Sequence, residues 1–132
     1  MKILPIAVSL MMATFTTAIA APPGYFDLTP GITLETGDTW SDGQTRYRLY
    51  GIQSCIRGTS YTDLQSQTRD CGEASLAVFA AFIKDTAPFC AAAAKTPDLT
   101  YVVCYATVAG KQLDLATMMI SQGFAFAALD PH

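Results

Sequence analysis

The sequence predicts an α+β protein: a β-barrel with helices, of the OB-fold-like five-stranded Greek-key class, with two helices. Three observations favour this fold: short strand-like segments separated by turns, a helix after the first strands, and a second helix near the C-terminus. An α+β sandwich is the alternative architecture. The length of 132 residues fits one domain and leaves no room for two.

The first half of the chain has the alternation typical of half-buried strands. Residues 32–36 alternate apolar and polar side chains, and residues 47–52 are a second strand-like segment, with Gly51 as a candidate bulge. An Asp-Gly turn within residues 41–44 joins the two as a hairpin. Residues 53–70 are rich in Ser, Thr and Gln and are interpreted as a long loop.

Two helices and further extended segments follow. The first helix begins after Asp70, which can cap it, with Glu73 placed to reciprocate, and Pro88 ends it. The second helix is expected over residues 113–122. The other segments expected to be extended are residues 89–91, 101–108 and 124–128, the last of them extended or irregular.

Charge and histidine content exclude several classes of function. The chain has 8 Lys and Arg against 11 Asp and Glu, a net charge of −3, so it lacks the basic surface that binds polyphosphates, and nucleic acid is not an expected partner. The single histidine is the C-terminal residue, His132, which disfavours Ser-His-Asp and Cys-His catalytic units and His-rich zinc sites.

The N-terminus has the three parts of a secretory signal peptide. Lys2 precedes an apolar run, and Ala18-Ile19-Ala20 is a small-x-small cleavage site. An uncleaved membrane anchor is the alternative, but the run is shorter than the roughly 20 residues that span a bilayer. We therefore expect a signal peptide at 1–20, an N-terminal arm at 21–30 and a domain at 31–132. The protein would be exported, periplasmic or secreted, with no membrane span after cleavage.

Four cysteines, all beyond the leader, indicate disulfides in an exported chain. No Cys-x-x-Cys spacing occurs, which disfavours a redox motif or a zinc ribbon. The count alone leaves three pairings open.

Four segments, in order, carry a resemblance to a known family; they are residues 37–39 (Gly-Asp-Thr), 47–52, 71–75 and 110–125. Together they resemble the staphylococcal nuclease (thermonuclease) family, over residues 32 to about 128. The resemblance implies an OB barrel with packed helices and calcium-assisted phosphodiester hydrolysis. The family's third helix has no counterpart here, and Leu129 and Pro131 stand where the family has two tyrosines.

The resemblance keeps part of the family's site and replaces the rest. Asp38 matches a metal-binding carboxylate, with Thr39 as its motif neighbour, and Arg48 matches a phosphate-binding arginine. The degraded positions are Thr36 in place of the first aspartate of the family's Asp-Gly-Asp-Thr motif, Gln53 in place of the second metal-binding aspartate, Ile56 in place of the glutamate that acts on water, and Leu99 in place of the second arginine. The retained residues also have plainer interpretations, since Asp38 can shape a turn and Arg48 can pair with a carboxylate such as Asp38.

The same resemblance implies a disulfide pairing. It places the strand of Cys90 beside the strand of Cys104, which favours a Cys90–Cys104 bridge. Cys55 and Cys71 bracket the long loop, and a Cys55–Cys71 bridge would tie its ends.

The lost groups predict little nuclease activity, because a general base contributes about 10²–10⁴ in rate and an arginine at the phosphoryl group about 10³–10⁵. We expect a monomeric binding or structural module without a cofactor, whose partner is an unknown protein, a glycan or a small ligand. The alternative is an active calcium-dependent phosphodiesterase that uses Arg57, Asp63 or Arg69 from the 56–70 loop. An unrelated hydrolase is a third possibility, for which we find no triad or carboxylate pair.

Overall fold

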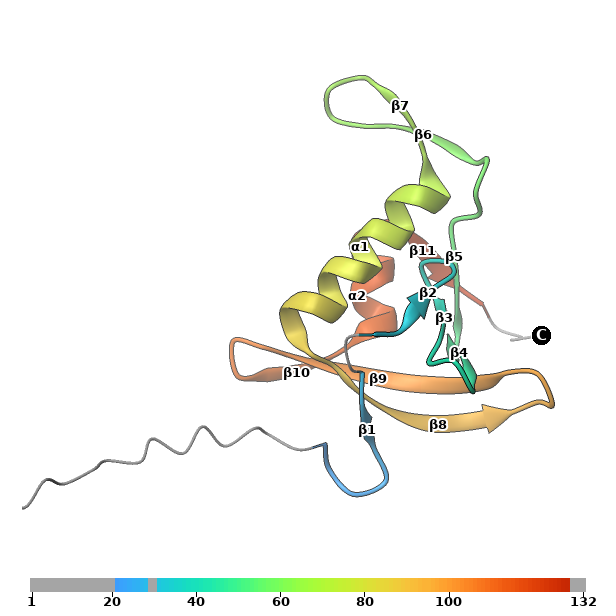
Figure 1. Cartoon of the computed structure of the whole chain (residues 1–132). Coiled ribbons are helices and arrows are strands. Elements are labelled where there is room, and N and C mark those ends of the chain that lie inside the picture. The colour runs from blue at the N-terminus through green and yellow to red at the C-terminus, as the bar shows by residue number, and fades with distance from the viewer. Residues whose placement is uncertain (1–20, 29–30, 129–132) are drawn as a thin grey trace, which may run out of the picture.

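Residues 21–28 and 31–128 are described in the computed structural model, which shows a mixed α+β fold. A curled sheet lies against two helices, α1 (Cys71–Thr86) and α2 (Leu115–Ser121), and both helices lie on the same side of the long strands (Figure 1). The expected signal peptide at 1–20, Leu129 and Pro131 lie outside the described residues. In the part of the chain described, neither helix is long and apolar enough to cross a membrane.

The strands are short and most belong to one sheet. In chain order they are β1 (Phe26–Asp27), β2 (Thr33–Leu34), β3 (Thr39–Ser41), β4 (Arg46–Leu49), β5 (Ile52–Ser54), β6 (Ser60–Thr62), β7 (Thr68–Asp70), β8 (Phe89–Lys95), β9 (Thr100–Val108), β10 (Lys111–Asp114) and β11 (Ala125–Ala127). The main sheet runs β1-β8-β9-β4-β3-β2, with β10 also paired to β9. Two small sheets pair β11 with β5 and β6 with β7.

The sheet curls because its two edges belong to one short stretch of chain. β1 and β2 lie within residues 26–34, yet β1 pairs with β8 at one end of the order and β2 pairs with β3 at the other. Strands β4 and β9, in the middle, run parallel, whereas the other pairs are antiparallel. This curled half-barrel with two helices agrees with the barrel-with-helices class that the sequence predicts.

The core fills the concave side between sheet and helices. Trp40 of β3 packs on Phe79 of α1 with ring centroids 5.5 Å apart. Cys90 and Cys104 face each other across β8 and β9, and both are fully buried. The other buried members of this core are Leu28, Leu49, Ile52, Val102, Leu115, Ala116 and Met119.

Both expected disulfides are present. Cys90–Cys104 joins two neighbouring strands inside the core, and Cys55–Cys71 joins the end of β5 to the start of α1. Of the three pairings that the cysteine count allows, the structure has the one favoured in the sequence analysis. Two disulfides indicate that the chain folds in an oxidising environment.

The helix ends are set by local chemistry. The Asp70 carboxylate accepts the N–H of Glu73 at 3.0 Å, which confirms the predicted cap of α1. The prediction of a reciprocal hydrogen bond from the Glu73 side chain is wrong, because the Glu73 carboxylate instead forms an ion pair with Arg57 at 2.8 Å. The second helix begins at Leu115 rather than 113, since residues 111–114 pair with β9 and Asp114 caps the helix.

Three further expectations need correction. Residues 53–70 are not a plain loop: they complete β5 and contain the hairpin β6–β7. The strand expected at 89–91 extends to Lys95, because β9 is long enough to pair with all of it. The segment expected as an arm at 21–30 is not simply exposed over its described residues, 21–28, because β1 pairs with β8 and Leu28 is buried in the core.

Candidate functional site

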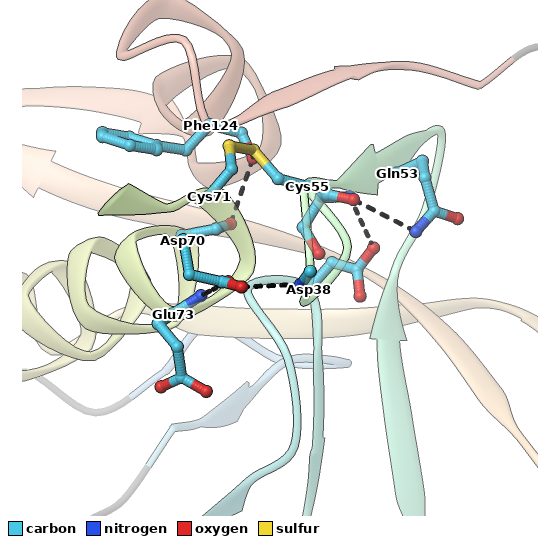
Figure 2. The surroundings of a disulfide bond; sticks show 10 residues. Asp38, Gln53, Cys55, Asp70, Cys71, Glu73 and Phe124 are labelled. Carbon is cyan, nitrogen blue, oxygen red and sulfur yellow. Dashed lines mark hydrogen bonds between the residues drawn. A yellow bond between two sulfur atoms is a disulfide. The ribbon is translucent and has the colours of Figure 1, made fainter. Parts of the chain in front are cut away.

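The residues that the sequence singles out around Asp38 meet where β3, β4 and β5 approach the N-terminal end of α1. Asp38 directly precedes β3 and is buried. Its backbone carbonyl accepts the N–H of Leu49 at 2.9 Å, which fixes it against β4. Figure 2 shows Asp38 and Gln53 in the same region as the Cys55–Cys71 disulfide.

Both oxygens of the Asp38 carboxylate are occupied by protein donors. Oδ1 accepts hydrogen bonds from the hydroxyls of Thr36 and Thr39, each at 2.7 Å. Oδ2 accepts the backbone N–H of Ser54 at 3.0 Å and lies 3.5 Å from Nη2 of Arg48. A carboxylate offers about four acceptor positions; three of them take hydrogen bonds from the protein, and Oδ2 also faces the positive charge of Arg48.

The Arg48 guanidinium is also engaged. Its Nη2 donates to Oε1 of Gln53, and Nε2 of Gln53 donates to the carbonyl of Ser54 at 3.2 Å. Gln53 therefore ties Arg48 of β4 to β5. Arg48 thus contacts both the Asp38 carboxylate and the Gln53 amide. This agrees with the structural interpretation, in which Arg48 pairs with a carboxylate of its own chain.

Close packing against α1 holds this network in place. A Cβ built on Gly37 would lie 1.9 Å from Oγ of Ser75, so only glycine fits there. Ser75 in turn donates to the carbonyl of Phe124 at 3.0 Å, and the same carbonyl accepts the N–H of Cys55. The glycine of the Gly-Asp-Thr segment thus serves a helix contact.

The remaining residues named from the resemblance lie apart from this network. The Ile56 side chain is 64% exposed. Leu99 directly precedes β9 and lines a shallow pocket with Arg46, while the β9 residue opposite Arg48 is Tyr101. The network therefore joins Thr36, Asp38, Thr39, Arg48 and Gln53, and leaves out Ile56 and Leu99.

The site does not fit calcium. A hard cation needs several oxygen ligands with free lone pairs, whereas the Asp38 carboxylate already accepts three hydrogen bonds and is paired with the Arg48 guanidinium, whose positive charge repels a cation. No cluster of three or more acidic, histidine or cysteine residues that could hold a metal occurs within residues 21–28 and 31–128.

The charged loop residues hold the hairpin together. The Asp63 carboxylate accepts the N–H groups of Gln65 and Gln67 at 3.0 and 2.9 Å and pairs with Arg69. The Arg69 guanidinium, followed by the N–H of Gln67, lowers the pKa of Asp63. The N–H groups of Glu73 and then Gly58 lower the pKa of Asp70 in the same way.

The loop returns to α1 at a point of very close backbone approach. A Cβ on Gly72 would lie 2.3 Å from the backbone nitrogen of Arg57. The disulfide from Cys71 to Cys55 and the ion pair from Glu73 to Arg57 flank this contact. Three successive residues of α1 thus anchor the start of the loop.

Sequence reasoning missed Ser54 and Ser75. Ser54 acts through its backbone N–H, which leaves no signal in the sequence. Ser75 belongs to the 71–75 segment of the resemblance, where its packing against Gly37 could not be read from either residue alone.

No protein-family model, curated protein or solved structure matches this chain. The resemblance to nucleases therefore rests on residues 37–39, 47–52, 71–75 and 110–125 alone.

Proposed function

We propose that this protein is an exported, nuclease-like domain of the OB type that acts by binding a protein or a small ligand and does not cleave phosphodiesters. One observation carries the proposal: the carboxylate that corresponds to a metal ligand in the nuclease resemblance accepts three hydrogen bonds from the protein and forms an ion pair with Arg48. In this role Asp38 stabilises the junction of β3, β4 and β5, and the neighbouring guanidinium disfavours a cation there.

The strand order supports the OB assignment. β1 and β2, which are close in sequence, lie at opposite ends of the strand order, and a parallel pair, β4 and β9, lies between them. This arrangement suits a partly open barrel, the architecture of the OB fold.

The chemistry of phosphodiester cleavage supports the same proposal. It needs a base near the attacking water and cationic donors for the phosphoryl oxygens. The Ile56 side chain cannot act as a base, and the Leu99 side chain has no positive charge to stabilise the phosphoryl oxygens. The guanidinium of Arg48 already serves Asp38 and Gln53.

The phosphodiesterase alternative gains no support from the loop. Arg57 pairs with Glu73, and Asp63 pairs with Arg69, so the three loop residues nominated for catalysis stabilise the loop itself. Reaching a substrate would require breaking these pairs and the turn they hold.

Export is the second part of the proposal. The disulfides indicate an oxidising environment, and the leader at 1–20 has the pattern of a cleaved signal peptide. N-terminal sequencing of the protein from the periplasm or medium should begin at Ala21. A membrane-embedded product that still begins at Met1 would contradict this part alone.

The nuclease question is settled by assaying purified, oxidised protein on single-stranded DNA and on RNA with calcium. We expect no cleavage above a heat-inactivated control and no calcium binding by calorimetry. Cleavage near an ordinary enzyme's ~10 s⁻¹ would overturn the proposal. If the combined change Arg57→Gln, Asp63→Asn and Arg69→Gln then abolished that cleavage, the loop alternative would replace it.

A gain-of-function variant sharpens this assay. The triple change Gln53→Asp, Ile56→Glu and Leu99→Arg restores the family's residue types. Because Leu99 lies away from Asp38, and Asp38 keeps its three hydrogen bonds and its ion pair with Arg48, we expect the triple variant to remain inactive. Adding Thr36→Asp and Thr39→Ala, which removes both hydroxyl donors from Asp38, should be the first combination to bind calcium.

A further inference from the structure

The chain just before β1 is folded back by a tight turn. The Tyr25 N–H donates to the carbonyl of Pro22 at 3.0 Å, and Gly24 has a φ of 84°. A type II turn favours proline at its second position and requires a positive φ at its third, which Pro23 and Gly24 supply. Figure 1 shows the resulting reversal directly before β1. The turn therefore brings the residue that precedes Pro22 back toward β1.

The turn is anchored to the main sheet. The Tyr25 ring packs edge-on against Phe89 of β8, with centroids 5.5 Å apart, and against Tyr105 of β9, with centroids 6.3 Å apart. The two prolines add stiffness, because a proline ring locks φ near −65°. A proline also restricts the residue before it to extended backbone, and here that residue is Ala21. Little conformational entropy is therefore left to lose when Ala21 makes a contact.

A pocket of about 350 Å³ lies beside this turn, at the start of β8. Pro22 of the turn and Asp27 of β1 both line it, and Asp27 lies opposite Phe89 across β1 and β8. The other lining residues are Thr86, Ala87, Phe89, Thr107 and Gln112. The Asp27 side chain is the one ionisable group among these lining residues. The pocket wall therefore carries a negative charge and no positive one.

Signal cleavage creates a positive charge next to this pocket. Hydrolysis of the Ala20–Ala21 peptide bond consumes one water and leaves a carboxylate on Ala20 and an ammonium group on Ala21. An α-amino group has an ordinary pKa of about 7.7–8.0, so it is mostly protonated at pH 7. In the precursor the same nitrogen belongs to a neutral amide. Cleavage thus changes the charge of an atom whose neighbouring residue, Pro22, lines the pocket.

We propose that the new α-ammonium group of Ala21 occupies this pocket and pairs with the Asp27 carboxylate. The inference rests on the cleavage after Ala20 proposed above. The charges are opposite, and the turn already brings Pro22, the covalent neighbour of Ala21, to the pocket wall. The ion pair ties the N-terminus to β1, at one end of the main sheet. Processing thus completes a contact that the precursor lacks.

The elements around the pocket provide a matched control. The lining residues of α1, β9 and β10 are neutral, and the ionisable residues next to them in the chain are Asp85 of α1 and Lys111 of β10. Asp85 is an exposed carboxylate adjacent to a lining residue, but it does not line the pocket itself. Neutralising Asp85 therefore removes a nearby negative charge and leaves the proposed ion pair in place.

NMR titration of oxidised protein that begins at Ala21, prepared by cleaving a fusion partner directly before that residue, tests the pair. A nearby carboxylate favours the protonated amine, so the α-amino pKa should lie at least about 0.5 above its ordinary value. Asp27→Asn should return this pKa to the ordinary range, while Asp85→Asn should leave it raised. An ordinary α-amino pKa in the wild type, or a raised one that survives Asp27→Asn, overturns the proposal.

A second comparison measures stability. Placing Gly-Ser before Ala21 moves the ammonium group two residues away and keeps the net charge. At pH 7 the protein that begins at Ala21 should melt about 1–4 °C above the extended one, as expected for one exposed ion pair. The difference should vanish in Asp27→Asn. It should also vanish as pH rises through the raised α-amino pKa, since the pair requires a protonated amine. Equal melting temperatures at pH 7 overturn the proposal.

Failure of this inference is distinguishable from failure of the proposed export. N-terminal sequencing of the exported protein tests the cleavage site, whereas the titration uses protein prepared to begin at Ala21. If sequencing finds another first residue while the titration shows the pair, processing does not create the contact, and the proposed coupling is overturned. If sequencing finds Ala21 and the titration shows no pair, export stands and the ion pair is rejected.

Discussion

Among single residues, Asp38 is the most informative, because burying its carboxylate without partners would cost free energy. A buried carboxylate is stable only if its oxygens are paired. Two threonine hydroxyls, one backbone N–H and one guanidinium meet this need. The Gly-Asp-Thr segment is thus explained by folding, because its aspartate and threonine bond to each other and its glycine packs on α1.

Asp38→Ala should lower the free energy of unfolding by about 3–5 kcal/mol, because it leaves Arg48 and two hydroxyls without their partner. Urea unfolding measures the change. The matched control is Glu35→Gln, which loses an exposed ion pair with Arg46 and should cost below about 1 kcal/mol. Equal costs for the two variants would contradict a structural role for Asp38.

Gly37→Ala should be strongly destabilising for a steric reason. Its new Cβ would collide with the side chain of Ser75, and overpacking of this kind costs about 1–3 kcal/mol. Ser75→Gly removes the colliding atoms, so in a double-mutant cycle the second substitution should recover part of the loss. Additive costs would show that the two residues do not touch in solution.

The element scale is dominated by the loop between Cys55 and Cys71. Its composition resembles that of an unstructured linker, yet three separate interactions order it. The disulfide holds the base of the loop, the hydrogen bonds of Asp63 hold its tip, and the Asp70 cap holds its junction with α1. The hairpin is therefore an element in its own right.

The carboxylates of Asp63 and Asp70 make the stability of this hairpin depend on pH. Their hydrogen bonds lower both pKa values below the ordinary 3.8. An unfolded chain then takes up protons before the folded one, so stability present above pH 3.8 is lost as pH falls through the lower folded pKa values.

Thermal unfolding midpoints should therefore fall between about pH 5 and about pH 2. Asp63→Asn with Asp70→Asn should make this fall shallower, while Asp98→Asn, in an exposed turn, serves as the control. The same slope in the double variant and in wild type would show that these two carboxylates do not contribute.

At the scale of the whole molecule, closure of the sheet depends on residues 26–34. This segment contributes a strand to each end of the sheet and inserts Leu28 into the core. The N-terminal part of the domain thus has a structural role that its turn-rich sequence does not suggest.

Leu28→Ala should lower the free energy of unfolding by about 2–5 kcal/mol, as for other buried leucines. Tyr25→Ala, at an exposed ring packed on Phe89, should cost clearly less. Guanidinium unfolding of both variants provides the comparison. A Leu28→Ala protein as stable as wild type would mean that residues 21–30 are the exposed arm that the sequence suggests.

Features that depend on neighbouring residues could be predicted from the sequence. The cap of α1 at Asp70, the stop before Pro88 and the Asp-Gly turn each follow from the chemistry of a few adjacent side chains, although the turn joins β3 to β4 and not the segments 32–36 and 47–52. The strand from Thr100 to Val108 was also evident, because its β-branched and aromatic side chains are strand formers wherever they lie.

The rest of the fold follows from contacts between segments that are remote in sequence. Lys111–Asp114 is a strand since β9 offers a free edge to pair with, and β1 exists for the same reason at β8. The carboxylate of Asp38 looks like a metal ligand in sequence. Its three hydrogen-bond donors and its ion-pair partner Arg48, which come from residues 36 to 54, make it a buried structural group instead.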